Sequence, residues 1–251
     1  LRVYEEGGRF LITNVPVVLN FADVEALSKR CGDAPIVPAD ATKDGDMQRL
    51  FHQAGDHFGT IDFIVHSIGR SENIRKRASY EDLRYSWYLK TLEASAISLH
   101  RAIHAALPVL NDGASIVAMT YIGAERIFSR YNDMGDAKSL LQSIARNFGA
   151  RLGDRGIRVN TVSQSPTRTS AASGIRGFDA LYEFAERLSP LGNATAEECA
   201  DYVVTLLSDL TRKVTLQNLY HDGGFSQMGM NEQVIALIEC DTPPSPSDTS
   251  A

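Results

Sequence analysis

A tyrosine and a lysine that stand seven positions apart, Tyr131 and Lys138, are the residues of this chain best placed to do chemistry together. Seven residues are nearly two turns of an α-helix, at about 3.6 residues per turn, so both side chains project from one side of a helix. A phenol and an ammonium group are both hydrogen-bond donors, and their tips can converge on one ligand. The alternative is a surface tyrosine and a solvated lysine at chance spacing.

The helix that would carry this pair has the clearest periodicity in the chain. Apolar residues recur at helical spacing behind Ser129, a candidate N-cap, and predict a helix over residues 129–151. Other helical patterns cover residues 23–30, 46–58, 80–107 and 196–208. Between them, β-branched runs predict strands at residues 10–13, 36–38, 63–66, 115–119, 158–162 and 217–220. This alternation predicts a doubly wound, mostly parallel α/β sheet flanked by helices.

The start of the chain departs from the usual pattern of nucleotide-binding α/β folds. Such a fold opens with a strand and a Gly-rich turn whose backbone amides receive a pyrophosphate, and this sequence contains no such turn. Residues 1–6 are typical of the end of a helix, Gly7 and Gly8 of its stop, and residues 10–13 of the strand after it. We therefore expect a sheet that lacks its first strand. The alternative makes residues 10–13 the true first strand.

Composition excludes several classes of protein. The 251 residues are 43% apolar and 22% charged, which fits one large domain with a sizeable core. A net charge of −6 argues against nucleic acid as a partner. No apolar run approaches the roughly 18 residues that cross a bilayer, and no signal-peptide core opens the chain, so we expect a cytoplasmic location and no membrane partner. The three cysteines, Cys31, Cys199 and Cys240, are expected to be reduced.

Two further expectations concern organisation and metals. We expect a single Rossmann-type domain over residues 1–240, incomplete at its N-terminus, and a disordered tail over residues 241–251, which holds three prolines and no apolar anchor. His100 and His104 stand four apart on a predicted helix, but Arg101 replaces the glutamate of the zinc-protease pattern and no third ligand is evident. We therefore predict no metal site.

Several short segments occur in a fixed order, at residues 66–69, 120–126, 131–138, 163–169, 172–175 and 221–226. Together they resemble the enoyl-acyl-carrier-protein reductases of fatty-acid synthesis, a divergent branch of the short-chain dehydrogenases and reductases. The branch's carbonyl-reducing relatives place a tyrosine four residues before the lysine and a serine about thirteen residues before that tyrosine. Here these positions hold Met134 and Tyr121. A tyrosine seven residues before the lysine is what the resemblance to the enoyl reductases requires.

The resemblance implies a reaction. A hydride moves from the nicotinamide of NADH to the β-carbon of a trans-2-enoyl thioester on acyl carrier protein, and negative charge develops on the thioester oxygen. Tyr131 would donate a hydrogen bond to that oxygen, an effect of roughly 3–4 kcal/mol in the transition state. Lys138 would hold the nicotinamide ribose hydroxyls. Tyr121 would line the thioester pocket, with an ordinary packed tyrosine as the alternative.

The resemblance also assigns cofactor contacts, all at strand ends, where ligands of open α/β sheets bind. Asp40 and Ala41 follow one strand and match an acidic position beside the adenine. The remaining contacts are Ser67, Ile68, Gly69, Thr120, Lys138, Ser165, Pro166, Thr167 and Thr169. Many relatives carry Ala-Gly where this chain has Gln164 and Ser165. A purely structural loop is the alternative for each assignment.

NADH is favoured over NADPH by the end of the strand at residues 10–13. A 2′-phosphate would need a nearby arginine or lysine, and none occurs from residue 14 to residue 27. No acidic residue follows the strand to hold a 2′-hydroxyl either, and Asn14 is only a neutral substitute.

Partners and the acyl site follow from the same resemblance. It implies a homotetramer, and residues 171–188 resemble a mobile lid over the acyl chain. The cluster of Arg70, Arg75, Lys76 and Arg77 is either a docking surface for the acidic carrier protein or a solvated loop. Two other functions stay open: a related reductase that acts on another enoyl or carbonyl substrate, and an inactive assembly partner without the phosphate-binding turn.

Overall fold

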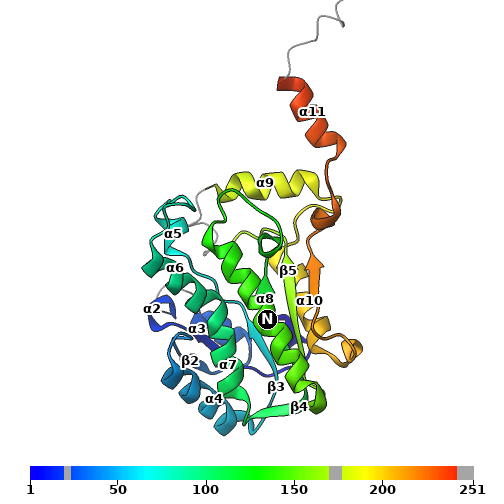
Figure 1. The fold of residues 1–251 in the computed structure, drawn as a ribbon. Helices are drawn as coiled ribbons and strands as arrows, with labels where there is room; N and C mark the ends of the chain where they lie inside the picture. The colour runs from blue at the N-terminus through cyan, green and yellow to red at the C-terminus, as the bar shows by residue number, and fades with distance from the viewer. Residues whose placement is uncertain (20–23, 170–176, 242–251) are drawn as a thin grey trace, which may run out of the picture.

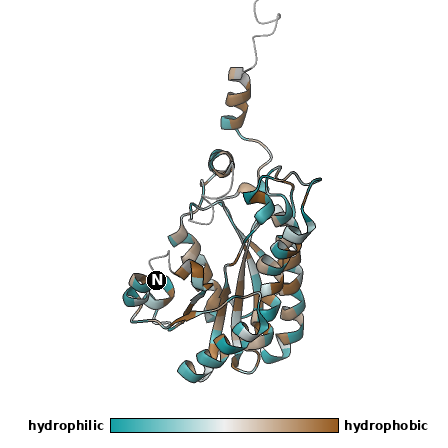
Figure 2. Cartoon of the chain, turned by 90° about the vertical axis from the view of Figure 1, so that its left-hand side faces the viewer, coloured by the Kyte–Doolittle hydropathy of each residue, from teal (hydrophilic) through white to brown (hydrophobic). Residues whose placement is uncertain are grey.

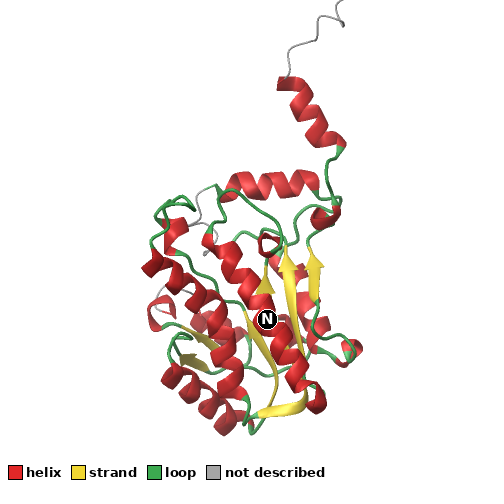
Figure 3. Ribbon diagram, in the orientation of Figure 1, coloured by secondary structure: helices red, strands yellow, loops and turns green. Residues whose placement is uncertain are grey.

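The computed structural model describes residues 1–19, 24–169 and 177–241 of the chain. Within these ranges, all paired strands are parallel and helices cover both faces of the sheets (Figure 1, Figure 3). The predicted doubly wound α/β fold is confirmed. The strands are β1 (Ile12–Asn14), β2 (Ile36–Pro38), β3 (Ile61–His66), β4 (Leu110–Thr120), β5 (Arg158–Gln164) and β6 (Asn218–His221).

The helices of the described ranges differ widely in length. α8 is the longest, with 20 residues. The bounds are α1 (Arg2–Glu5), α2 (Pro16–Leu19), α3 (Val24–Arg30), α4 (Asp44–Phe58), α5 (Glu72–Arg75), α6 (Tyr85–Leu92), α7 (Ser98–Ala106), α8 (Asp133–Leu152), α9 (Phe178–Leu188), α10 (Ala196–Leu207) and α11 (Glu232–Asp241). α11 projects away from the body of the molecule (Figure 1). None of the helices in these ranges has the length and apolar character that crossing a membrane requires.

The strands form two sheets rather than one. β1 pairs with β2, whereas β3, β4, β5 and β6 pair in that order. Among the described residues, nothing pairs β1 with β3, and a cavity of about 680 Å³ lies between them, lined by both strands and by α4 and α10. In the usual order of a doubly wound sheet, this gap is the place of the first strand. Among the described residues, β1 and β3 each keep one unpaired edge.

The core lies on both faces of β4, because successive side chains of a strand point to opposite sides. Ile116 packs into the cluster that α4, α7 and α8 supply through residues such as Leu99 and Leu141. Val117 packs with Val203 of α10 on the other face. In Figure 2 brown is prominent on the strands of the sheet, and the helices around it carry both brown and teal residues. This burial on two faces explains why residues 116–119 of β4 form a continuous apolar run in the sequence.

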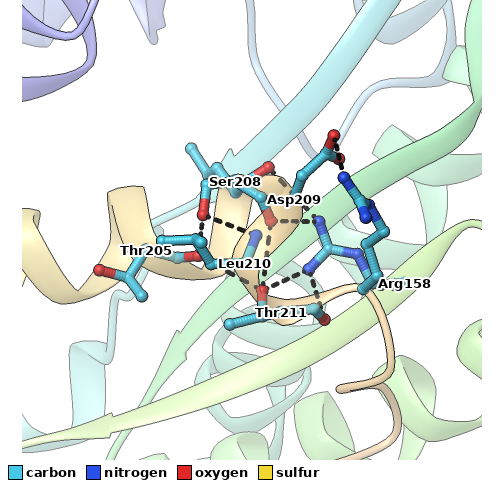
Figure 4. A network of polar contacts seen from close by, with 8 residues as sticks. Arg158, Thr205, Ser208, Asp209, Leu210 and Thr211 are labelled. Carbon is cyan, nitrogen blue, oxygen red and sulfur yellow. Dashed lines mark hydrogen bonds and ion pairs between the residues drawn. The ribbon is translucent and has the colours of Figure 1, made fainter.

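A buried arginine fixes the junction of β5 and α10 at the edge where β5 begins (Figure 4). Arg158 is 4% exposed. Its Nη1 donates to the Leu206 carbonyl at 2.7 Å and to Thr211 Oγ1 at 2.7 Å, and its Nη2 donates to the Ser208 carbonyl at 3.1 Å. The last carbonyls of a helix have no partner within the helix, and a cation is favourable there. Arg158 therefore caps α10 from the neighbouring strand.

All six predicted strands are present, with ends that differ by up to five residues, the largest difference being at β4. The helix predicted over residues 80–107 is wrong in extent, because helical structure there begins at Tyr85 and ends at Ala106. It consists of α6, a π-helical turn at Glu93–Ile97 and α7. The helix predicted from Ser129 begins at Asp133. α9 lies within the predicted lid, of which residues 171–176 lie outside the described residues, as does the predicted tail beyond residue 241.

Candidate active site

The strands β3, β4, β5 and β6 run parallel, so their carboxyl ends lie at one edge. In the register, His66 is opposite Ala118, Thr120 is opposite Ser163, and Gln164 is opposite His221. The segments that follow these strands hold most of the predicted site residues. The fold therefore brings together residues from four distant parts of the sequence at the edge where such sheets bind ligands.

Lys138 lies between the ends of β3 and β4. Its side chain reaches from α8 into the interior, and Nζ donates to the Met119 carbonyl at 2.8 Å and to the Ile68 carbonyl at 3.5 Å. Burial lowers the pKa of Lys138 from 10.5 to about 8. An ammonium group has three N–H donors, and the third has no acceptor among the described residues. Lys138 can therefore still donate one hydrogen bond to a ligand.

The two predicted tyrosines lie against each other beyond the end of β4. The rings of Tyr121 and Tyr131 have centroids 5.0 Å apart at an angle of 60°. Burial raises the pKa of both phenols, so both are neutral hydrogen-bond donors near pH 7. The Tyr121 hydroxyl is buried and has no hydrogen-bond partner in the described part of the chain. Buried hydroxyls normally have a partner, so this one is available to a ligand.

Tyr131 does not lie on the helix that carries Lys138, which corrects the prediction that one helix presents both. α8 begins at Asp133, and the N-cap residue Asn132 has φ of 53° and ψ of −138°. A residue with a side chain rarely adopts such a backbone, which costs about 1–3 kcal/mol. Tyr131 instead reaches the site because the chain turns sharply before the helix. Both side chains still flank the end of β4, Lys138 at the Met119 carbonyl and Tyr131 on the Tyr121 ring.

Gly123 makes room for the Tyr131 ring. A Cβ atom built on Gly123 would lie 2.5 Å from Cδ1 of Tyr131 and 3.0 Å from Cδ1 of Tyr121. Carbon atoms in contact are normally about 3.5–4.0 Å apart. The glycine is therefore needed for the observed position of Tyr131, which the spacing of Tyr131 and Lys138 alone did not indicate.

The loop after β3 presents backbone to the site. Ser67, Ile68 and Gly69 are exposed. A Cβ atom on Gly69 would lie 3.9 Å from Nζ of Lys138, so this loop borders the buried ammonium group directly. The loop is held from the other side by Ser95, whose Oγ accepts from the Arg70 amide at 2.9 Å.

The predicted residues after β4 and β5 are in place, but several already have partners. Buried Thr120 accepts a long hydrogen bond of 3.5 Å from Gln142. Ser165 Oγ accepts from the Ala194 amide at 2.9 Å, so this hydroxyl ties the end of β5 to the loop before α10. Thr167 Oγ1 donates to the Ser165 carbonyl at 3.1 Å. The other two predicted residues of this segment are Pro166, which is buried, and Thr169, which is exposed.

Asp40 and Ala41 lie apart from this group, after β2 in the separate two-stranded sheet. Asp40 Oδ1 accepts from the backbone amide of Thr42 at 3.0 Å and from its hydroxyl at 2.7 Å. The carboxylate therefore closes a local turn. Whether it also contacts an adenine stays a prediction.

The residues at the strand ends fit a ligand with several oxygen and nitrogen atoms. Two buried hydroxyls, those of Tyr121 and Ser163, lack partners among the described residues, and Lys138 has an N–H to donate. Buried polar groups are normally satisfied, so unsatisfied ones at one edge indicate a ligand. A nicotinamide nucleotide has the hydroxyls and carboxamide to satisfy them. Within the described ranges no group of three or more metal-ligating side chains occurs.

Comparison with known proteins agrees with this site. The model of the family "Enoyl-(Acyl carrier protein) reductase" matches residues 1–226. The chain is 35% identical over 208 residues to enoyl-[acyl-carrier-protein] reductase [NADH] 1 of Rhizobium meliloti, covering 82% of this chain and 76% of that protein. It is 34% identical over 194 residues to the Bacillus subtilis reductase FabI, covering 77% of this chain and 75% of that protein.

A solved structure gives the same result. The FabI–NADH complex of Alistipes finegoldii superposes with a TM-score of 0.91 at 52% sequence identity, covering 93% of this chain and 83% of that chain. The chain belongs to the enoyl-acyl-carrier-protein reductase family.

Proposed function

We propose that this chain reduces trans-2-enoyl-acyl carrier protein to acyl-acyl carrier protein in fatty-acid elongation, with NADH as reductant. The observation that carries the proposal is the position of Tyr131, packed on Tyr121, and of buried Lys138 at the end of β4. This arrangement occurs in a chain whose curated relatives are NADH-dependent enoyl reductases.

The residues of the chain divide the work. Bound NADH supplies the hydride. Lys138 donates its remaining N–H to the ribose hydroxyls and orients the cofactor, while the backbone of Ser67, Ile68 and Gly69 borders the same space. The neutral Tyr131 phenol donates a hydrogen bond to the thioester oxygen, where negative charge develops only as the reaction proceeds. Tyr121 packs on Tyr131 and holds its ring in place.

The test is the oxidation of NADH with crotonyl-acyl carrier protein. We expect Tyr131→Phe to lower kcat by about 10²–10³-fold, because the phenol acts on the transition state, and to leave NADH binding unchanged. Tyr4→Phe is the control, since Tyr4 is 42% exposed on α1, away from the ends of β3 and β4. Full activity of Tyr131→Phe would exclude the proposed role of the phenol. Faster turnover of acetoacetyl than of crotonyl thioester would indicate a carbonyl reductase instead, and no NADH oxidation would indicate an inactive partner.

The preference for NADH is supported by the end of β1. Asn14 follows the strand, and its Oδ1 accepts from the Val15 amide at 2.8 Å, so it offers no cation to a 2′-phosphate. We expect kcat/KM to be at least about tenfold higher with NADH than with NADPH, since a charge-assisted pair would be missing. Equal values would contradict this preference.

Carrier-protein docking is proposed for the exposed cluster of Arg75, Lys76 and Arg77. Arg77 lines a cavity of about 770 Å³ that Tyr131 also lines, so the cluster lies at an approach to the site. Charge reversal of Arg75 and Arg77 to glutamate should raise KM for crotonyl-acyl carrier protein and leave KM for crotonyl-coenzyme A unchanged. The control is Arg151→Glu, in the last turn of α8. Equal effects on both substrates would favour a merely solvated loop.

Assembly and location complete the proposal. A homotetramer is supported by exposed apolar side chains along α6, where Tyr85 and Leu89 are 80% and 63% exposed. Light scattering should give four times the mass of the chain, and a monomer would contradict it. A cytoplasmic location is supported by the three free cysteines. Residues 1–240 are proposed to act as one domain, and cell fractionation and limited proteolysis test these two points.

A further inference from the structure

We propose that Asp133 is a positioning residue for Tyr131 and Lys138. Its buried carboxylate ties the segment after β3 to the first turn of α8, and this tie sets where the phenol and the ammonium group lie. The inference rests on the proposed function, and it adds a residue that the Tyr131–Lys138 spacing does not indicate.

The carboxylate of Asp133 is enclosed and has a donor on each oxygen. Asp133 is 0% exposed. Oδ1 accepts from Ser71 Oγ at 2.6 Å, and Oδ2 accepts from Asn73 Nδ2 at 2.8 Å. Both donors are themselves buried. Hydrogen bonds to a charged acceptor are the stronger kind, and the helix N-terminus also favours the negative charge. The three side chains therefore form one closed polar unit.

This unit fixes more than a local contact. Ser71 Oγ also accepts from the Ile74 amide at 3.0 Å and caps α5. Asn73 Oδ1 accepts from the Arg84 amide at 3.3 Å, at the start of α6. One carboxylate thus holds residues 71–84 against α8. This segment begins at Ser71, three residues after Ile68, whose carbonyl accepts a hydrogen bond from Lys138. The loop beside the ammonium group is therefore anchored at Ser71.

The strained residue Asn132 links this unit to Tyr131. Its φ of 53° is a conformation that a residue with a side chain keeps only when its surroundings hold it. Asn132 Nδ2 donates to the Ala78 carbonyl at 2.8 Å, and the next residue is Asp133, so two successive side chains anchor into residues 71–78. Loss of the Asp133 anchor should let Asn132 relax, and Tyr131 would move with it.

The test is an exchange of polarity. In Asp133→Asn, one oxygen remains for the two donors Ser71 and Asn73, so one of the two hydrogen bonds is lost. The double variant Asp133→Asn with Asn73→Asp restores it in the opposite direction, since the new carboxylate accepts from the new amide and still accepts from the Arg84 backbone amide. Position 133 keeps an oxygen for the Ser71 hydroxyl in both variants. Asp136→Asn is the matched control, because Asp136 lies in the same turn and accepts only from Tyr80 and Tyr88 among the described residues.

We expect Asp133→Asn to lower kcat with saturating crotonyl-acyl carrier protein and NADH by about 10²-fold, because a small misplacement of the phenol costs that much, and to weaken NADH binding as well, because the loop beside Lys138 is released. The exchange variant should recover at least about tenfold of this loss. A kcat of Asp133→Asn equal to that of the wild type, or an exchange variant no better than the product of its single variants, would overturn the proposal. A general structural defect would not be rescued by the exchange variant.

A second readout needs no turnover. Hydrogen exchange of the amides in residues 71–74 and 131–134 should speed up in Asp133→Asn and slow again in the exchange variant. If wild-type enzyme does not oxidise NADH with crotonyl-acyl carrier protein, the proposed function fails while the exchange data still test the anchor. If the wild type is active and exchange in these residues is unchanged by Asp133→Asn, the anchor fails alone.

Discussion

His66 is predicted to limit the stability of this fold in acid. It is the last residue of β3 and is 3% exposed. Its Nε2 lies 2.8 Å from Ser98 Oγ, and Ser98 gives its own proton to the Ala94 carbonyl at 2.7 Å. Nε2 must therefore donate and Nδ1 carries no proton. Nδ1 is buried and has no partner among the described residues, so a proton added there would have no acceptor.

The magnitude follows from the pKa of His66. Burial, and then the charge of Lys138, lower it from 6.5 to about 3. A pKa that is lower in the folded than in the unfolded state means that the unfolded chain binds more protons between these values. The stability is complete above pH 6.5 and is lost as the pH falls toward 3. At about 1.36 kcal/mol per pH unit, the loss by pH 4.5 is about 3 kcal/mol.

The variant His66→Gln removes this titration and keeps an N–H for Ser98. Urea unfolding should show that the wild type loses about 3 kcal/mol more than His66→Gln between pH 7.5 and pH 4.5. Carboxylates titrate in both proteins, so the difference between the two isolates His66. The control His104→Gln, at an exposed site on α7, should follow the wild type. Parallel stability curves for the wild type and His66→Gln would refute the reasoning.

Three further variants test other parts of the structure. Lys138→Met should abolish turnover. It should also remove a rise in stability of up to about 3 kcal/mol that the wild type shows from pH 8 to pH 10.5, because the pKa of Lys138 is 10.5 in the unfolded chain and about 8 in the folded protein. Urea unfolding at both pH values measures this rise. Arg158→Met should lower the free energy of unfolding by about 3 kcal/mol, because it leaves buried carbonyls at the end of α10 unpaired, and thermal unfolding checks this. Gly123→Ala should lower kcat by about 10²-fold by displacing Tyr131, whereas Gly153→Ala, with open space around its Cβ, should not.

The strands could be predicted from short runs with β-branched residues between helical patterns, and β4 and β5 are largely buried, as parallel strands covered on both faces are. Their ends could not. β4 continues back to Leu110 through Asn111, Asp112 and Gly113, residue types that are typical of turns. Pairing of Ile61 with Leu110 across the sheet extends the strand there, and this pairing is a tertiary effect.

α9 was missed although its apolar residues carry a signal. Leu181, Ala185 and Leu188 recur at helical spacing and pack into the cluster around Tyr121. The small residues just before the helix favoured a lid instead. A helix and a lid are compatible descriptions of one segment. The spacing of Leu181, Ala185 and Leu188 indicates the helix independently of the small residues that precede it.

The Tyr131–Lys138 spacing predicts a pair that the fold does place at the end of one strand, but through a geometry that is partly wrong. Helical periodicity does not describe Asn132, whose backbone is held by contacts with Ala78 rather than by its neighbours in sequence. The partners of Asp133 are 60 and 62 residues away along the chain. Contacts at such separation are set by the order of the strands, so they follow from the fold and not from the local pattern.

Several unfavourable features of this fold lie at the carboxyl edge of the larger sheet. The desolvated ammonium group of Lys138, the strained backbone of Asn132 and the unpartnered hydroxyls of Tyr121 and Ser163 all lie at or beyond the carboxyl ends of the strands. At the opposite edge, the buried cation Arg158 is fully engaged by carbonyls. A fold selected for stability alone would satisfy both edges alike. The unpartnered polar groups at the carboxyl edge therefore point to ligand binding there, on physical grounds that are independent of any family resemblance.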